Sequence, residues 1–253
     1  MKNLRLISTI IVKDKLAIQS FNYKDYLPLG KVEIIVKNFD RWNSDEILVN
    51  CIDRSKKKLG PDFELLEKIS SENISTPIIY GGGIRNLNDA VTVIKSGADR
   101  ILLENLIYND YKELIKIKKI LGSQAIVLSL PVLLINKKLK QFDYINDKII
   151  DLNQNFKYAI KEKLISEILL IDKNYEGSLL STFDSSILKQ LKFELPLIYF
   201  GGINSINKIK KIINDKRISA VGIGNSLNYS EHRIQKIKDT ITKFRKPFYS
   251  ENI

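Results

Sequence analysis

The sequence contains very few of the residues that build disulfides and metal sites. Its 253 residues include one cysteine, Cys51, and one histidine, His232. A lone cysteine excludes an internal disulfide, and without clustered histidines and cysteines we expect neither a bound metal nor another cofactor. No apolar run approaches the length of about 18 residues that a membrane span needs, and the first residues lack the layout of a signal peptide. We therefore expect a cytoplasmic protein.

Positive charge is in excess, with a formal net charge of +12. An excess of this size can mark a surface for nucleic acid or for an anionic ligand. The lysines are nevertheless spread along polar helix faces, as in 112–119 and 208–216, and are not gathered among aromatic residues. We interpret them as solvated helix faces, and we expect no nucleic-acid or membrane partner.

Short apolar runs alternate with longer amphipathic stretches along the chain. Such alternation is typical of βα units that build a parallel sheet. The predicted strands are Arg5–Val12, Glu46–Cys51, Pro77–Tyr80, Arg100–Leu103, Ala125–Leu130, Glu167–Ile171, Pro196–Phe200 and Ser219–Ile223. The predicted helices lie near residues 30–43, 61–71, 86–96, 109–121, 155–165, 184–192, 205–215 and 231–243. Because no linker divides this series and a closed (β/α)8 barrel needs about 250 residues, we expect one domain over residues 1–253.

An internal repeat favours a closed barrel over an open sheet. The segment 77–84 recurs at 196–203, an offset of 119 residues, with six of eight positions identical. Segment 45–49 matches 166–170 at an offset of 121, and the first and fifth predicted strands match at 120. We interpret the two halves as similar (β/α)4 units, which together make one α/β TIM barrel.

A glycine pair follows the third and the seventh predicted strand, at Gly82 and Gly83 and at Gly201 and Gly202. Glycine lets backbone N–H groups approach an anion closely, and the start of the next helix adds further donors. Because the motif occurs once in each half, a ligand with a phosphate at each end would span the barrel mouth. The alternative is a tight strand-to-helix turn that binds nothing.

These features together resemble the cyclase subunit of imidazole glycerol phosphate synthase. The resemblance is carried by the glycine turns, by segments 95–100 and 122–127 and by the half-barrel repeat, and it extends from Arg5 to about residue 240. It implies a barrel that receives ammonia from a separate glutaminase subunit docked at its base. At the opposite mouth, the family uses this ammonia in a ring-closing lyase reaction of histidine biosynthesis, on a ligand with a phosphate at each end.

The resemblance also implies an ammonia gate at the barrel base, made of four charged residues at the N-terminal ends of four strands. All four positions are charged here, as Arg5, Glu46, Arg100 and Glu167. Two cations and two anions can neutralise one another, and moving one aside would open a path for a small neutral molecule. Asp99 matches a family position that contacts the glutaminase. The alternative is a salt-bridge ring that serves only stability, as the bottom face of such barrels usually does.

The catalytic end departs from the family pattern. Ile11 and Pro131 stand where the family carries two aspartates for acid–base chemistry, and neither can transfer a proton. The two positions are equivalent under the half-barrel repeat, so the same function is absent from both halves. Cys51 also replaces a usual aspartate, and we interpret it as a small packing residue. We therefore assign no catalytic residue and expect no efficient cyclase reaction.

The predicted phosphate contacts are only partly kept. Gln19 replaces a phosphate-contacting lysine of the family, and Glu104 introduces a carboxylate that would repel phosphate. After the sixth strand, Glu176, Gly177 and Ser178 match the family in kind, and Gly177 joins the glycine pairs as a predicted phosphate contact. A small phosphorylated ligand therefore remains among the partners that the sequence allows.

Several segments resemble a divergent branch of the family that is found with surface-polysaccharide genes. That branch works beside a glutaminase and an ATP-using amidotransferase, which converts a sugar N-acetyl group into an acetamidino group. The segments are 39–46, 60–66 and the pair His232 and Arg233. This resemblance implies a barrel that conducts ammonia from the glutaminase to the amidotransferase.

Three hypotheses follow from these residues. The chain is an ammonia-delivering subunit for sugar amidination, or a cyclase of histidine biosynthesis, or a non-catalytic barrel that stabilises a glutaminase partner. The second hypothesis requires Asp53, Glu104 or Glu176 to have taken over proton transfer. We prefer the first, because the base keeps its charges while the mouth has lost both aspartates.

Overall fold

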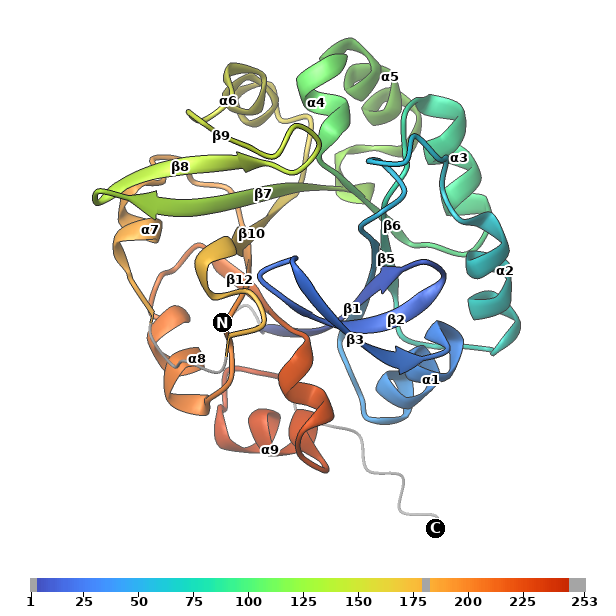
Figure 1. Cartoon of the computed structure of the whole chain (residues 1–253), viewed down its shortest axis with the longest axis vertical. Coiled ribbons are helices and arrows are strands. Elements are labelled where there is room, and N and C mark those ends of the chain that lie inside the picture. Colours follow the sequence, from blue (N-terminus) through green and yellow to red (C-terminus); the bar gives the residue numbers. More distant parts are fainter. Residues whose placement is uncertain (1–3, 179–182, 246–253) are drawn as a thin grey trace.

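Eight parallel strands close into a barrel in the part of the chain that this computed structural model describes, residues 4–178 and 183–245 (Figure 1). In chain order they are β1 (Arg5–Lys13), β4 (Glu46–Cys51), β5 (Ile78–Gly81), β6 (Arg100–Leu103), β7 (Ile126–Ile135), β10 (Glu167–Asp172), β11 (Leu197–Phe200) and β12 (Ile218–Ile223). Hydrogen bonds join them in the order β10, β11, β12, β1, β4, β5, β6 and β7, and β7 pairs with β10 to close the ring. The prediction of a (β/α)8 barrel is confirmed.

Helices cover the outer surface of the barrel (Figure 1). They are α1 (Val32–Arg41), α2 (Phe63–Ser71), α3 (Leu87–Lys95), α4 (Asn105–Asn109), α5 (Tyr111–Leu121), α6 (Gln154–Lys161), α7 (Ser186–Gln190), α8 (Ile206–Ile212) and α9 (Arg233–Thr240). Short 3-10 turns occur at η1 (Ser123–Ala125), η2 (Lys173–Tyr175) and η3 (Asn225–Asn228). Polar side chains such as Asp62 and Asn86 accept backbone N–H groups at helix starts, as N-caps do. None of the described helices is long and apolar enough to cross a membrane.

Apolar side chains form two layers, because successive residues of a strand point to opposite faces of the sheet. On β1, Leu6 and Ile10 pack on the outer side with helix residues, whereas Ile7 and Ile11 belong to the layer inside the barrel. The inner layer consists of Ile7, Ile11, Ile18, Leu48, Ile79, Leu102, Val127, Leu169, Ile171, Ile198, Phe200 and Ala220. The barrel is therefore filled mainly by branched aliphatic side chains, as closed eight-stranded barrels usually are.

Two antiparallel hairpins at the barrel mouth are absent from the predicted elements. The pair β2 (Leu16–Phe21) and β3 (Asp25–Gly30) follows β1, and the pair β8 (Lys138–Asp143) and β9 (Lys148–Ile150) follows β7. A turn of two residues at positive φ leads into each pair, Asp14 and Lys15 between β1 and β2, and Asn136 and Lys137 between β7 and β8. Such turns usually contain glycine, so their sequence signal is weak here. Because β1 and β7 open the two halves of the barrel, the hairpins follow its internal symmetry.

The remaining differences from the predicted elements are small. The helix expected near 109–121 is α5 and is preceded by the separate short helix α4, and the helix expected near 184–192 is the short α7. The one domain expected over 1–253 stays a prediction, because residues 1–3, 179–182 and 246–253 lie outside the described residues.

Candidate functional site

The four charged side chains at the barrel base form a closed ring of ion pairs. Arg5 Nη1 lies 2.7 Å from Glu46 Oε2, and Arg5 Nη2 pairs with Glu167 Oε1. Arg100 Nη1 completes the ring, 2.7 Å from Glu167 Oε2 and 3.4 Å from Glu46 Oε1. Each carboxylate therefore contacts both guanidinium groups, and positive and negative charges alternate. The structure brings together all four residues that were predicted for the gate.

Burial and neighbouring hydroxyl groups hold this ring. The side chains of Glu46 and Glu167 are 9% and 8% exposed, and Ser219 Oγ donates to Glu167 at 2.6 Å. Burial raises the pKa of Glu46 above its usual value, although both guanidinium groups oppose it. Burial acts on Glu167 in the same direction, but Arg5, Arg100 and Ser219 together outweigh it and lower the pKa of Glu167. Removing one member would leave each of its two neighbours with a single ion-pair partner in a buried position, which is unfavourable.

Asp99 lies exposed at the base, directly before Arg100 in the chain. Its Oδ2 accepts the backbone N–H of Ile78 at 2.8 Å, which fixes the carboxylate at the start of β5. A protein docked at the base could reach this side chain. Its contact with a glutaminase stays a prediction.

The barrel interior is apolar directly after the ring. Ile7, Leu48, Leu102 and Leu169 each follow a ring residue by two positions, and all four belong to the inner layer. They are the next inward-facing side chains on these strands, because strand residues alternate between the two faces. Such a layer disfavours an ion, which would lose its water, far more than a small neutral molecule.

Apolar side chains fill the two mouth positions at which the resemblance implies aspartates. Ile11 is 3% exposed and belongs to the inner layer. Pro131 is buried and lies opposite Ile171 in the pairing of β7 with β10. Neither side chain can accept or donate a proton. Both have a packing role in this structure.

Two other carboxyl groups at the mouth are largely withdrawn from water. Glu104 follows β6 and accepts a 2.7 Å hydrogen bond from Ser129 Oγ on β7. Glu176 lies in the loop after β10 and accepts hydrogen bonds of 3.0 Å from Ser20 Oγ and from the backbone N–H of Tyr23. Burial raises the pKa of each carboxyl group to about 7, against the opposing effect of these hydrogen bonds. Carboxyl groups that titrate near neutral pH in a cleft are candidates for proton transfer or for cation binding.

Asp53 and Cys51 are poorly suited to proton transfer. The carboxylate of Asp53 pairs with Lys57 at 2.8 Å and accepts the backbone N–H of Asp14 at 3.2 Å. Cys51 is 2% exposed, and burial raises the pKa of its thiol to about 12, which supports the interpretation as a packing residue. In the described part of the chain, no three His, Cys, Asp or Glu side chains come together as metal ligands would.

The tips of the two hairpins approach each other across the barrel mouth (Figure 1). The rings of Tyr23 and Tyr144 meet edge to face, with their centroids 4.9 Å apart. Tyr144 also packs on Phe142, and the hydroxyl of Tyr26 donates to the carbonyl oxygen of Tyr23 at 2.6 Å. Neither tyrosine of this pair is among the predicted site residues. They are 121 residues apart, so the offset of the half-barrel repeat is the signal that could have found them.

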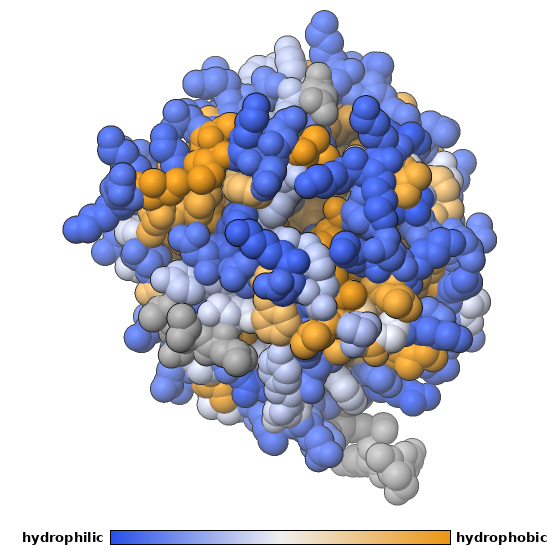
Figure 2. Space-filling view, viewed as in Figure 1, coloured by the Kyte–Doolittle hydropathy of each residue, from blue (hydrophilic) through white to orange (hydrophobic). Residues whose placement is uncertain are grey.

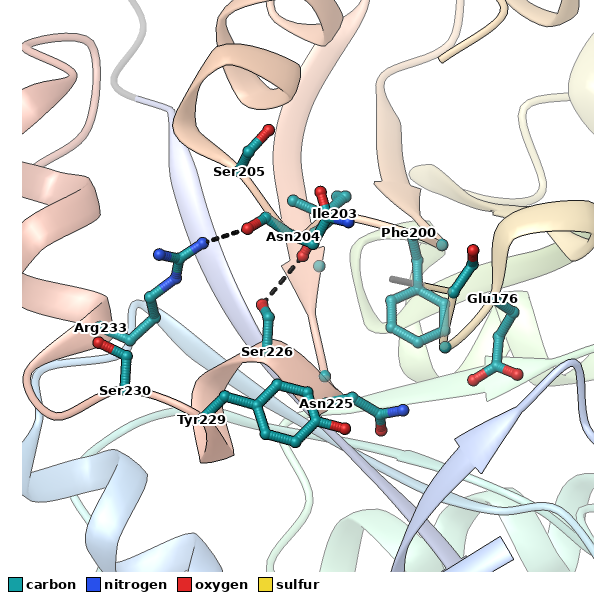
Figure 3. A pocket seen from close by; sticks show the side chains of 16 residues that line it. Glu176, Phe200, Ile203, Asn204, Ser205, Asn225, Ser226, Tyr229, Ser230 and Arg233 are labelled. Atoms are coloured by element: carbon teal, nitrogen blue, oxygen red, sulfur yellow. Dashed lines mark hydrogen bonds between the residues drawn. The ribbon is translucent and has the colours of Figure 1, made fainter. Parts of the chain in front are cut away.

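A cavity of about 470 Å³ contains the phosphate contacts predicted for the second half of the barrel (Figure 3). Three of the predicted glycines line it, namely Gly177, Gly201 and Gly202. Arg233 also lines it and donates to the backbone carbonyl of Asn204 at 2.7 Å, whereas Glu176 lies on the opposite side in this view. The cavity thus offers an anion one guanidinium group and several glycine backbones. Phosphate binding there stays a prediction.

The first glycine pair lies in different surroundings. Gly82 and Gly83 line a separate cavity of about 160 Å³, which also contains Glu104. The N–H of Gly83 already donates to Ser55 Oγ at 3.2 Å. A side-chain carbon on Gly82 would collide with the carbonyl oxygen of Cys51, so this turn requires glycine whether or not a ligand binds. Each cavity is lined by one carboxyl group, Glu104 here and Glu176 in the larger cavity, but the larger cavity also holds the guanidinium group of Arg233, whereas the cation here is the exposed Lys56.

Comparison with known proteins identifies the family. Residues 5–233 match the family model described as histidine biosynthesis protein. The chain belongs to the histidine biosynthesis protein family. Its predicted relationship to the cyclase-type subunit of this family is confirmed, whereas its place in the divergent branch stays a prediction.

Three relatives within this family illustrate the similarity. A Vibrio vulnificus protein, provisionally named imidazole glycerol phosphate synthase subunit hisF2, is 29% identical over 235 residues, which cover 92% of this chain and 86% of the relative. A Leptospira interrogans protein, provisionally named subunit HisF of the same synthase, is 26% identical over 231 residues, which cover 89% of this chain and 90% of the relative. The imidazole glycerol phosphate synthase subunit HisF of Clostridium botulinum is 24% identical over 243 residues, which cover 92% of this chain and 94% of the relative. The similarity therefore extends over nearly the whole barrel.

Proposed function

We propose that this chain is the ammonia-delivering subunit of a glutamine-dependent amidotransferase system. A glutaminase would dock at the base, and the whole chain would act as one barrel domain that passes ammonia to the mouth. The closed ring of Arg5, Glu46, Arg100 and Glu167 carries this proposal, since it is a barrier of paired charges lying directly below an apolar interior. Opening it requires only that one side chain move.

The chemistry of the interior favours ammonia as the molecule that passes. Neutral ammonia gives up hydrogen bonds to water when it enters a hydrocarbon layer, but the cost is much smaller than for a charged ion, which loses several kcal/mol of hydration even after relaxation. The layer formed by Ile7, Leu48, Leu102 and Leu169 would therefore admit NH3 and reject ammonium. This property supports a conduit that keeps the nitrogen reactive until it reaches the mouth.

We infer that the nitrogen acceptor is a sugar of a surface polysaccharide, handled by an ATP-dependent amidotransferase at the mouth. Ile11 and Pro131 support this function, because a conduit needs no acid or base of its own at these positions. The choice of a sugar rests on the resemblance of segments 39–46 and 60–66. A phosphorylated acceptor would bind in the cavity beside Arg233.

Binding to a candidate glutaminase from the same organism tests the proposal. We expect a stable complex by titration calorimetry and faster glutamine hydrolysis in the mixture than in the glutaminase alone. Asp99→Arg reverses an exposed charge at the base and should weaken the complex by roughly tenfold or more, equivalent to about 1.4 kcal/mol. Asp25→Arg reverses an exposed charge on β3 at the mouth and is the matched control with unchanged affinity. A pair that neither binds nor stimulates hydrolysis would contradict the proposal.

A second candidate is a cyclase of histidine biosynthesis that uses Glu104 and Glu176 for proton transfer. The pKa of about 7 that burial gives both carboxyl groups favours it, because general acids and bases work best near the ambient pH. Expression of this chain in a strain that lacks the cyclase separates the two candidates. Ammonia delivery predicts no growth without histidine. Growth that is lost in both Glu104→Gln and Glu176→Gln would establish the cyclase instead.

A further inference from the structure

The cavity of about 160 Å³ at the mouth connects the barrel interior with the two hairpins. Leu102 and Ile171 belong to its lining and also to the inner apolar layer. The tyrosines of the hairpin tips, Tyr23 and Tyr144, form another part of its lining. The cavity therefore lies between the inner apolar layer and the hairpin tips.

Aromatic rings enclose much of the cavity. Tyr23, Tyr26 and Tyr144 all line it, and the contact between Tyr23 and Tyr144 together with the hydrogen bond from Tyr26 to Tyr23 fixes their positions. The hydroxyl groups of Tyr23 and Tyr144 are buried and have no hydrogen-bond partner among the described residues. A buried hydroxyl without a partner is unfavourable, so these two oxygens are available to a ligand that donates N–H bonds.

A carboxylate supplies the charge of the cavity. Glu104 lines it and is held by the hydrogen bond from Ser129 Oγ. Within the described residues, no ion pair involves Glu104, and Lys56, the cation in the cavity lining, is exposed. A carboxylate among aromatic rings is the arrangement that recognises ammonium groups, because the faces of the rings are also negative.

We propose that this cavity binds ammonium or a small primary-amine cation, with Glu104 as the counter-charge and Tyr23, Tyr26 and Tyr144 as the walls. The inference deepens and rests on the proposed function, since ammonia that leaves the apolar interior becomes this ligand by taking the proton of the Glu104 carboxyl group, which is left as the carboxylate that faces the ammonium. The cavity is larger than one water molecule, whose share of liquid volume is about 30 Å³, so methylammonium also fits. Phosphate is disfavoured by the carboxylate and by the engaged N–H of Gly83.

Methylammonium chloride is the probe for this site. Isothermal titration calorimetry of the purified chain, with sodium chloride titrated as the control for ionic strength, should reveal saturable binding of methylammonium. Glu104→Gln keeps an oxygen that can accept from Ser129 but removes the charge, and should weaken binding at least tenfold. Glu67→Gln, at an exposed position on α2, is the matched control and should bind as the unmodified chain does. Tyr144→Phe retains the ring and removes one hydroxyl, and should weaken binding several-fold.

Three results would overturn the inference. They are the absence of saturable methylammonium binding, equal binding by the chain and its Glu104→Gln variant, and saturable binding of inorganic phosphate that competes with methylammonium. The glutaminase experiment is independent of these results. If the chain binds methylammonium through Glu104 but does not engage a glutaminase, the site stands and the proposed function fails. If it engages the glutaminase but binds no methylammonium, the proposed function stands and this inference fails.

Discussion

Replacing Glu104 by glutamine should stabilise the folded chain at alkaline pH. Burial raises the pKa of this carboxyl group to about 7 from its ordinary value of 4.5. The folded chain therefore holds this proton more tightly than the unfolded chain does. Glutamine has nearly the same shape and can still accept the hydrogen bond from Ser129. It removes the cost of placing a charge in this cavity.

The direction of the pH dependence follows from the raised pKa. Well below pH 4.5 both states hold the proton, and the group does not affect stability. As the pH rises towards 7, the unfolded chain loses its proton first and the free energy of unfolding falls. Above pH 7 the free energy of unfolding has fallen by the amount that corresponds to the full difference between the two pKa values, about 3 kcal/mol. The glutamine variant does not pay this penalty.

Urea unfolding followed by circular dichroism at pH 5 and at pH 8 measures the effect. Between these two values the chain should lose about 2–3 kcal/mol more stability than Glu104→Gln does. Glu67→Gln, an exposed replacement on α2, should retain the pH dependence of the unmodified chain. If Glu104→Gln and the unmodified chain lose stability in parallel, the carboxyl group is not desolvated in the folded state, and the reasoning is refuted.

Two further predictions concern buried hydrogen bonds and the ring. Tyr199→Phe removes the 2.7 Å hydrogen bond from the Tyr199 hydroxyl to Asp172 Oδ2. Urea unfolding should show a free energy of unfolding lowered by about 1–3 kcal/mol. An unchanged value would contradict the importance of this bond. Glu167→Gln should destabilise the chain more at pH 7 than Glu46→Gln, because the pKa of Glu167 is lowered and that of Glu46 is raised. Thermal unfolding compares the two variants, and the reverse order would contradict the assigned directions.

The barrel could be predicted from strand periodicity, and the charged ring from the resemblance to the cyclase subunit, which implies a charged residue at the start of four strands. A ring residue such as Arg5 or Glu46 opens a strand, and the first residue of each strand lies at the base of a closed parallel barrel. The alternation of side chains then places Ile7 and Leu48 inside. The apolar runs supplied the number of strands, and the internal repeat favoured a closed barrel over an open sheet. No contact between distant loops had to be known for these inferences.

The mouth could not be predicted in the same way, because it is built by contacts between segments far apart in the chain. Tyr23 and Tyr144 meet only when both hairpins fold over the barrel, and no local pattern marks their turns. The sequence indicated that Glu104 would repel phosphate, but not that burial would shift its pKa to about 7. Glu176 likewise acquires its partners, Ser20 and the backbone of Tyr23, from the first hairpin. Desolvation of both carboxyl groups is a property of the folded hairpins.

Isotope competition tests most directly whether nitrogen travels along the barrel. A candidate glutaminase, this chain and a candidate ATP-dependent sugar amidotransferase from the same organism would be supplied with [amide-15N]glutamine in a buffer that contains excess unlabelled ammonium. Mass spectrometry of the amidated sugar then measures the fraction of nitrogen that came from glutamine. We predict mostly 15N product, and a fall towards the unlabelled pool with Ala220→Phe, which fills part of the inner layer. Product with the isotope content of the surrounding ammonium, with or without this chain, would contradict delivery through the barrel.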